Sequence, residues 1–398
     1  MSTAAHIVHT GLLTAIGIDT ASCLESLKKG KTGIGKANLL QTHWANDLPV
    51  GEIGLTNREL AKHTGLSESH PRTALISAWA VQEALSPFQK MRKGLKCGFF
   101  SANTVGGMDI TESVYHRIKK RSDELYPNEI KHHECGAVTE IVSNHFDIHD
   151  FVTTISTACS SSANSIMMAA QMIEENMLDM AIAGGADCLS RFTLNGFNTL
   201  MILDHEPCQP FDNNRRGLNL GEGAGYVILM NEKAMKQCDA QSICIVSGYA
   251  NANDAFHQTA SSPDGIGNML AMSEAIKRAG ILPEDIDYIN LHGTGTANND
   301  SSEGKAITTL FGNNVPKASS TKGFTGHTLG GCGGVEAVLS TLAIRDGLVF
   351  PNLRWQNQME DVPWKPVTEL QSNQRIKHVL SNSFGFGGNC SSLVFSKL

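Results

Sequence analysis

A single cysteine, Cys159, lies in the stretch TISTACSSSANS, residues 154–165, among serine, threonine and alanine residues. The β-rich run DFVTTIST leads into it, and apolar residues at helical spacing follow it. A cysteine at the start of a helix faces the positive end of the helix dipole, which favours the thiolate over the thiol. The pattern predicts either a nucleophile that admits a bulky substrate or a buried cysteine that ends a strand.

Two histidines stand in glycine-rich motifs further along the chain. His292 belongs to NLHGTGTANNDSSEGKAI and ends a hydrophobic run, where chemistry on an α/β sheet usually lies. Thr294 and Thr296 alternate with glycine, so their hydroxyls can face a ligand close to the backbone. Lys322 and His327 share STKGFTGHTLGGCGGVEAV. A dinucleotide-binding interpretation of these glycines has little support, because no ribose-binding acid follows at the right distance.

The C-terminal motif SNSFGFGGNCSSLVF places a glycine-rich loop between two expected strands. Such a loop can aim a backbone N–H at an oxyanion, or it can be an ordinary hairpin turn. Its two phenylalanines argue against an exposed hairpin tip. One cysteine and two histidines, all at strand ends and far apart in sequence, indicate a nucleophile-plus-base arrangement assembled by the fold.

The elements that must position these residues alternate between strand, turn and helix, which predicts an α/β fold. The 398 residues suffice for one large domain or two fused halves. The alternation restarts near Asn231, although no sequence repeat is evident. We therefore expect an N-terminal half, 1–235, and a C-terminal half, 236–398. The polar stretch around 110–150 is predicted to be a surface insertion.

Composition narrows the class of protein. A net charge of −7 gives no indication of nucleic-acid binding. No apolar run is long enough to predict a membrane span, and no signal peptide is evident. Ten cysteines without CxxC pairs predict reduced thiols and a cytoplasmic location.

Together the motifs resemble a known family. VHTGLLTAIG, STACSSSANS, PFDNNRRGLNLGEGAG, HGTGT, KGFTGHTLGGCGGVEA and SNSFGFGG follow one another over nearly the whole chain. In this order they resemble the β-ketoacyl-acyl carrier protein synthases of the elongating, Cys-His-His type, which belong to the thiolase superfamily. The resemblance implies a thiolase-like fold of duplicated βαβαβαββ halves in five layers, α-β-α-β-α. It also implies a dimer.

The resemblance further implies roles for individual residues. Cys159 would take the acyl chain as a thioester, with small neighbours making space for it and for the pantetheine arm. His292 and His327 would hold the malonyl thioester carbonyl, and Lys322 would orient them. Supporting residues would be Glu336, Phe386 and Asp300, with the Phe386 N–H completing the oxyanion hole. Substrate-binding residues would be Thr294, Thr296, Phe197 and Phe384. A structural monovalent cation, found in some relatives, would lie near Asn290, Glu336, Ser381 and Asn382.

The implied reaction is decarboxylative condensation of malonyl-acyl carrier protein with the acyl-Cys159 thioester, building a fatty acid, polyene or polyketide chain. No bound cofactor is expected, because the carrier's phosphopantetheine brings the substrates. The expected partners are acyl carrier protein, docking on basic residues such as Arg72, Arg117, Lys119, Lys120 and Arg121, and a second subunit. That subunit would make a homodimer or a heterodimer with a chain-length factor. A thiolase-type acyltransferase and a Cys-His hydrolase remain alternatives. Asn389 and Cys390 replace the family's usual Thr-Asn.

Overall fold

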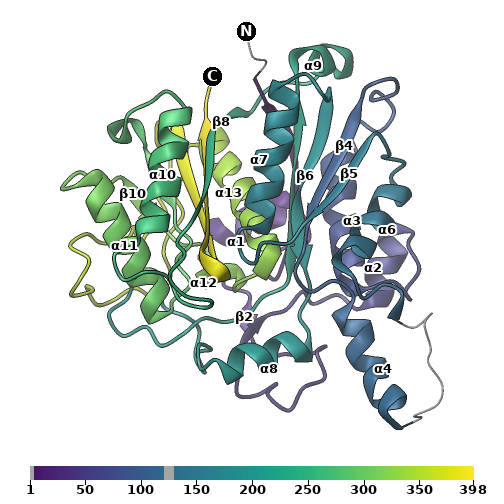
Figure 1. Cartoon of the computed structure of the whole chain (residues 1–398), viewed down its shortest axis with the longest axis horizontal. Coiled ribbons are helices and arrows are strands. Elements are labelled where there is room, and N and C mark those ends of the chain that lie inside the picture. The colour runs from purple at the N-terminus through teal and green to yellow at the C-terminus, as the bar shows by residue number, and fades with distance from the viewer. Residues whose placement is uncertain (1–3, 121–129) are drawn as a thin grey trace.

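The structure, a computed structural model, describes residues 4–120 and 130–398. The N-terminal half contains eight principal elements in the order βαβαβαββ (Figure 1). They are β1 (His6–Thr14), α3 (Arg72–Leu85), β4 (Cys97–Ala102), α6 (Cys135–His145), β5 (Phe151–Ile155), α7 (Ser161–Glu174), β6 (Met180–Asp187) and β7 (Gly223–Met230).

The C-terminal half repeats this order. Its elements are β8 (Cys244–Asn253), α10 (Ile266–Arg278), β9 (Tyr288–Asn290), α11 (Ala297–Phe311), β10 (Lys317–Ser319), α13 (Cys332–Asp346), β11 (His378–Gly385) and β12 (Asn389–Ser396). The remaining elements lie within or between the two repeats: α1 (Thr20–Lys28), β2 (Ile34–Gly35), β3 (Val50–Gly51), α2 (Asn57–Thr64), α4 (Met108–Lys120), α8 (Arg191–Thr199), α9 (Glu232–Cys238), α12 (Lys322–Thr325) and the 3-10 turns η1 (Pro283–Asp285), η2 (Leu329–Gly331) and η3 (Phe386–Gly388).

Strand pairing confirms the predicted duplication. The strand order is β5-β4-β6-β7-β1 in one half and, in mirror sequence, β8-β12-β11-β9-β10 in the other. In each half the two outer pairs are parallel and the two inner pairs antiparallel. The halves join where β1 meets β8 over only two residue pairs, beginning at His6 and Ile245.

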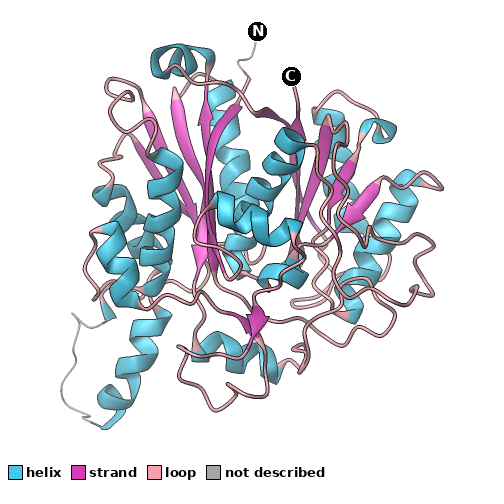
Figure 2. Ribbon diagram, turned by 180° about the vertical axis from the view of Figure 1, so that it is seen from behind, coloured by secondary structure: helices cyan, strands magenta, loops and turns pink. Residues whose placement is uncertain are grey.

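Helices complete a five-layered arrangement (Figures 1 and 2). α7 and α13 contact each other and strands of both halves, so they form the central layer. α13 is buried on nearly all sides, as a central helix must be. It approaches β7 closely because Gly225 and Gly334 lack side chains: a Cβ on Gly334 would lie 2.4 Å from the Gly225 carbonyl oxygen. The predicted thiolase-like α/β fold is confirmed.

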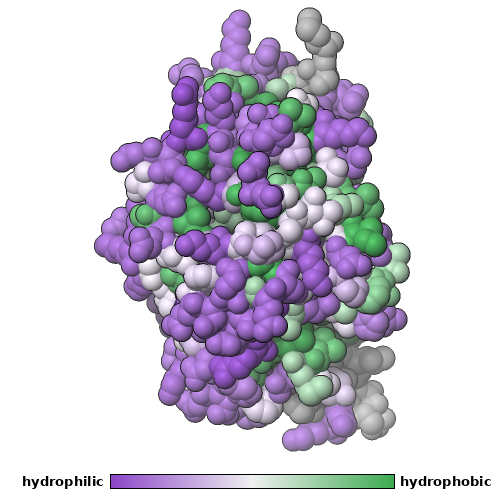
Figure 3. Space-filling view, turned by 90° about the vertical axis from the view of Figure 1, so that its left-hand side faces the viewer, coloured by the Kyte–Doolittle hydropathy of each residue, from purple (hydrophilic) through white to green (hydrophobic). Residues whose placement is uncertain are grey.

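The outer layers face solvent. α3 and α6 cover one half, whereas α10 and α11 cover the other, with separate hydrophobic clusters beneath them. The molecular face on the α10 and α11 side is mainly hydrophilic, with small apolar areas between polar side chains (Figure 3). No described helix is long and apolar enough to cross a membrane.

Two sequence-based boundaries look different in the structure. The expected division after residue 235 falls inside α9, which joins β7 to β8. The stretch 110–150 is not simply a surface insertion, because α6 lies within it and buries Val138 and Val142 in the core beside α3. Within α6 the exposed polar residues are Glu140, Asn144 and His145, on the solvent side of this outer-layer helix.

Candidate active site

Cys159 lies in the turn between β5 and α7, in the middle of the molecule. Its predecessor Ala158 has φ +53, a left-handed conformation that is costly for a residue with a side chain. The turn places the thiol before the N-cap of α7, Ser160, and buries it. The predicted junction of strand and helix at the cysteine is therefore present.

The serines after Cys159 do not line the cavity in front of it, contrary to expectation. Ser160 and Ser161 bond back to the carbonyl oxygens of the same turn, at 2.7 and 2.5 Å. Ser162 accepts a hydrogen bond from the Gly334 N–H of α13 at 2.8 Å. These residues are small because the starts of the two central helices pack against each other there. Space for the substrate comes from other elements.

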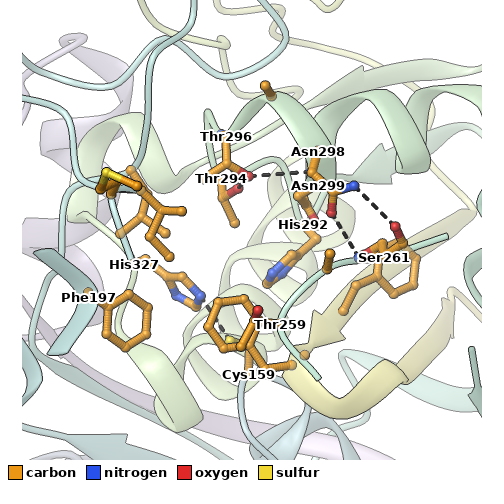
Figure 4. A pocket seen from close by; sticks show the side chains of 18 of the residues that line it. Cys159, Phe197, Thr259, Ser261, His292, Thr294, Thr296, Asn298, Asn299 and His327 are labelled. Carbon is orange, nitrogen blue, oxygen red and sulfur yellow. Dashed lines mark hydrogen bonds between the residues drawn. The ribbon is translucent and has the colours of Figure 1, made fainter. Parts of the chain in front are cut away.

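Both predicted histidines converge on the thiol (Figure 4). His327 Nε2 lies 3.1 Å from Cys159 Sγ. The His292 and His327 rings are nearly perpendicular, with centroids 5.3 Å apart. One nitrogen of each ring and the sulfur all lie within 4.8 Å of one another. The sequence placed these three residues in separate motifs, and the fold brings them into one buried cluster.

The hydrogen-bond partners assign the tautomer of each ring. His327 Nδ1 accepts from the Leu329 backbone N–H at 3.3 Å. His292 Nδ1 lies 3.2 Å from the Lys322 ammonium, which can only donate. Each ring therefore carries its proton on Nε2, toward the cavity. Burial and the Lys322 charge hold the pKa of both histidines well below the ordinary value, so both rings are neutral donors.

The same partners argue against a metal ion at this cluster. A cysteine and two histidines are a common zinc ligand set. A ligating histidine normally donates its second ring N–H to an acceptor, whereas here both Nδ1 atoms accept from donors. Coordination through Nε2 would break both contacts. The cluster is built to bind a negatively charged or carbonyl oxygen.

Lys322 forms a buried ion pair with Glu336 and also donates to the His292 carbonyl oxygen at 2.6 Å. The Glu336 carboxylate raises the pKa of Lys322, and burial raises the pKa of Glu336 to about 7. We assign the pair as ionised, because each buried charge compensates the other in direct contact. It fixes the position of the ammonium and hence the tautomer of His292.

Burial raises the pKa of the Cys159 thiol to about 11, although Lys322 and the Phe386 backbone N–H oppose this rise. The thiol of the free protein is thus mostly protonated at neutral pH. The helix start alone, on which the sequence-based expectation of a thiolate relied, does not overcome the loss of hydration.

The glycine-rich loop after β11 reaches the thiol as predicted. The Phe386 N–H donates to the sulfur, which places it where it can also stabilise an oxyanion. Gly385 permits this approach, because a Cβ there would lie 2.9 Å from the Cys159 nitrogen. The Phe386 ring stacks on Phe197, with centroids 5.8 Å apart. Phe386 is thus positioned as both an oxyanion donor and a wall of the cavity.

A cavity of about 260 Å³ opens in front of the thiol. It brings together most of the residues singled out from the sequence. They are Cys159, His292, His327, Thr294, Thr296, Phe197, Phe384 and Phe386. Thr294 and Thr296 share a hydrogen bond of 3.0 Å on one wall.

Asp300 and Glu303, both on α11, support the HGTGT loop from behind. Asp300 accepts from the Thr294 and Gly295 N–H groups, at 3.0 and 3.1 Å. Glu303 accepts from the His292 and Gly293 N–H groups, at 2.9 and 2.8 Å. The sequence motifs predict a supporting role for Asp300 but not for Glu303. Its place one helical turn after Asp300, in the first part of a helix that follows a catalytic motif, was the available signal.

The predicted cation position fits in part. Asn290 Oδ1 and Glu336 Oε2 are buried and lack hydrogen-bond partners among the described residues. Such oxygens suit a hard cation. The Asn382 side chain is already committed, since it donates to Glu303 and accepts from Ser392. Ser381 is buried nearby on β11. A cation held by Asn290 and Glu336 would keep the Lys322 network rigid.

Asn389 and Cys390 lie outside the cavity. The Cys390 thiol donates to Asn268 Oδ1 on α10 at 3.1 Å, and Asn389 contacts the Phe386 carbonyl oxygen at 3.4 Å. Among the predicted docking residues, Arg72 is wrong, because its guanidinium is buried against Glu222. Lys119 and Lys120 are exposed at the C-terminal end of α4, whereas Arg121 and the side chain of Arg117 lie outside the described part of the chain.

Comparison with known proteins agrees with this geometry. The family description "Beta-ketoacyl synthase, N-terminal domain" matches residues 67–234, and "Beta-ketoacyl synthase, C-terminal domain" matches residues 243–356. The chain therefore belongs to the β-ketoacyl synthase family, condensing enzymes of the thiolase superfamily.

Individual relatives align over the full length. The chain is 35% identical to "3-oxoacyl-[acyl-carrier-protein] synthase 2" of Coxiella burnetii, covering 98% of each chain. It is 30% identical to the protein of the same description from Staphylococcus aureus, covering 100% of this chain and 99% of that one. Among solved structures, the Xenorhabdus doucetiae ketosynthase (ApeO) in complex with its chain length factor (ApeC) matches with a TM-score of 0.84 and 28% identity, over 100% and 98% of the two chains. The ishigamide ketosynthase/chain length factor shares the fold, with a TM-score of 0.94.

Proposed function

We propose that this enzyme condenses malonyl-acyl carrier protein with an acyl group held on Cys159, and so elongates the acyl chain by a two-carbon unit. The observation that supports this most strongly is the pair of Nε2–H donors, from His292 and His327, beside a buried thiol. Relatives named 3-oxoacyl-[acyl-carrier-protein] synthase 2 support the same reaction.

The first half-reaction loads the enzyme. The Cys159 thiol releases its proton, and the thiolate attacks the acyl thioester. The carbon–sulfur bond to the carrier breaks, and the carrier thiolate takes up a proton from water as it leaves. The oxyanion that forms lies next to the Phe386 N–H, which already points to the sulfur. The neighbouring charge of Lys322 favours the thiolate at the moment of attack.

The second half-reaction forms the new bond. The malonyl thioester carbonyl accepts from both Nε2–H groups, the bond to the carboxylate breaks, and carbon dioxide leaves. The electron pair becomes an enolate held by the two donors. The enolate attacks the acyl-Cys159 carbonyl, and the bond from that carbonyl to the Cys159 sulfur breaks. The released Cys159 thiolate then takes up a proton from water. No bound cofactor is required by these steps.

The alternatives are less well supported. A thiolase would need a second cysteine in the cavity, but Cys390 faces Asn268 outside it. A Cys-His hydrolase would need a histidine lone pair toward the thiol, whereas His327 presents Nε2–H. ApeO is solved in complex with its chain length factor ApeC, which supports pairing of this enzyme with a homologous subunit.

A second subunit has a suitable surface on β5. Within the described residues β5 pairs only with β4, so its other edge is unpaired, and Val152 there is 37% exposed. An unpaired strand edge is a ready template for pairing with another chain. We place the homologous subunit at this edge. The ten cysteines are all unpaired, which supports a cytoplasmic location.

The test combines two readouts. Intact-mass spectrometry detects which acyl groups load from a panel of acyl carrier proteins, and carbon dioxide release reports malonyl decarboxylation. We expect loading on Cys159 and a 3-oxoacyl product. Release of free acid without malonyl carrier would instead indicate a hydrolase.

A further inference from the structure

Arg216 lies at the rim of the Cys159 cavity. It is the only Asp, Glu, Lys or Arg among the cavity-lining residues in the part of the chain that the structure describes. Its side chain is 60% exposed, so the guanidinium lies at the open end and not beside the buried thiol. Nearby rim residues are polar but uncharged: Thr259, Ser261, Asn298 and Asn299.

The backbone holds this guanidinium in place. The next residue, Gly217, packs so tightly against a neighbouring segment that a Cβ at this position would lie 2.6 Å from the Ile202 carbonyl oxygen. Leu218 donates to that same oxygen at 2.8 Å. One NH2 group of Arg216 pairs with the buried Asp204 carboxylate at 2.8 Å. Asp204 anchors the side chain, and the high exposure leaves the other N–H groups in contact with water.

Any acyl group delivered to Cys159 must pass this rim. On the proposed function, from which this inference starts, the acyl group is attached to phosphopantetheine, whose phosphate lies at the opposite end of the arm from the thioester. When the thioester is at the thiol, the phosphate is therefore outside or at the rim. An arginine presents a planar fork of donors that matches a phosphate. The first turn of α11, from Ala297, lines the same rim and adds positive potential.

We propose that Arg216 binds the phosphate of the phosphopantetheine arm and makes the enzyme prefer phosphorylated acyl carriers over dephosphorylated ones. The contact positions the arm and does not take part in bond making. Its loss therefore weakens use of the substrate without altering the chemistry at Cys159.

The test compares two small substrates that differ only in the phosphate, acyl-phosphopantetheine and acyl-pantetheine. Acyl-enzyme formation is followed by intact mass to obtain kcat/KM for each. We expect the wild-type enzyme to prefer the phosphorylated substrate by roughly five- to tenfold, the range of a partly exposed charge-assisted contact. Arg216→Gln should abolish this preference, and Arg216→Lys should retain part of it.

Lys233→Gln is the matched control. Lys233 is similarly exposed and pairs with Asp179 at 2.9 Å. It belongs to α9, which lies at the opposite end of the molecule from α8, the helix whose Phe197 lines the cavity together with Arg216 (Figure 1). It should keep the wild-type preference. The proposal is overturned if the wild-type enzyme uses both substrates equally, or if Arg216→Gln slows both to the same degree. It is also overturned if the variant impairs only carrier-protein substrates, which would indicate a contact with the carrier's own side chains. Failure of any thioester to load on wild-type Cys159 would instead contradict the proposed function.

Discussion

Replacing His327 with alanine tests the assignment of the two rings as donors. The change removes the Nε2–H that lies 3.1 Å from Cys159 Sγ and leaves His292 as the remaining imidazole donor. Losing one of two donors to a developing oxyanion costs about 3–4 kcal/mol. Malonyl decarboxylation should therefore slow by about a hundred- to a thousandfold.

Acyl loading should fall for a different reason. A hydrogen bond to a charged group contributes about 1.5–3 kcal/mol, so its loss raises the thiol pKa by about one to two units. Because the pKa of Cys159 already lies near 11, the thiolate fraction should then rise about tenfold per pH unit across the neutral range. Loading by wild type and by His327→Ala should thus rise in parallel with pH, with the variant about ten- to a hundredfold slower throughout, whereas the decarboxylation rate should not follow this rise.

The assay measures both half-reactions between pH 6.5 and 9, with intact mass for loading and carbon dioxide release for decarboxylation. His327→Gln is the matched control, because its amide can place an N–H near the position of Nε2. It should retain more decarboxylation than His327→Ala. A variant that loses loading at every pH while decarboxylating at the wild-type rate would refute the proposed division of roles.

Four further outcomes follow from the site. Cys159→Ala should form no acyl-enzyme yet still release carbon dioxide from malonyl carrier, as both readouts above can show. Cys390→Ala should keep condensation within about threefold of wild type, because the Cys390 thiol contacts Asn268 and does not line the Cys159 cavity; loss of activity in a steady-state assay would revive the thiolase alternative. Glu336→Gln should leave the Lys322 charge buried without its partner and cost about 3–5 kcal/mol of unfolding free energy, measured by urea denaturation. Burial raises the pKa of Glu303 from 4.5 to about 7, so between these values the folded protein keeps a proton that the unfolded chain has released, and the free energy of unfolding should fall by at most about 1.4 kcal/mol per pH unit and level off above pH 7. Glu303→Gln should flatten that decline, and parallel pH profiles of the two proteins would count against it.

Sequence patterns were enough to predict the fold and to select the cysteine and two histidines that the structure brings together. Cys159, His292 and His327 stand in motifs whose order is specific, and alternating strands and helices indicated an α/β protein. The restart of the strand and helix alternation near Asn231 predicted two halves, but their common topology was inferred only through the resemblance, because the two halves show no visible sequence repeat. β1 and β8, for example, occupy equivalent places with unrelated residues.

Long-range packing explains what the sequence did not predict. The serines after Cys159 are small because Gly334, far away in sequence, packs against Ser162. Arg72 looked like a surface cation until the fold placed Glu222 beside it. In both cases the deciding neighbour is more than a hundred residues away, where local periodicity carries no information.

The hydrogen-bond donors that face the Nδ1 atoms of the two histidines are the most consequential of these long-range effects. A cysteine and two histidines are, as residue types, equally suited to holding zinc, taking a proton or stabilising an oxyanion. What distinguishes the three roles is the group on the far side of each ring. The Leu329 N–H and the Lys322 ammonium are both donors, and they leave each ring with its proton toward the cavity. These two contacts, one from a backbone N–H and one from a buried ammonium, thus favour carbonyl binding over the other chemistries that the same three side chains permit.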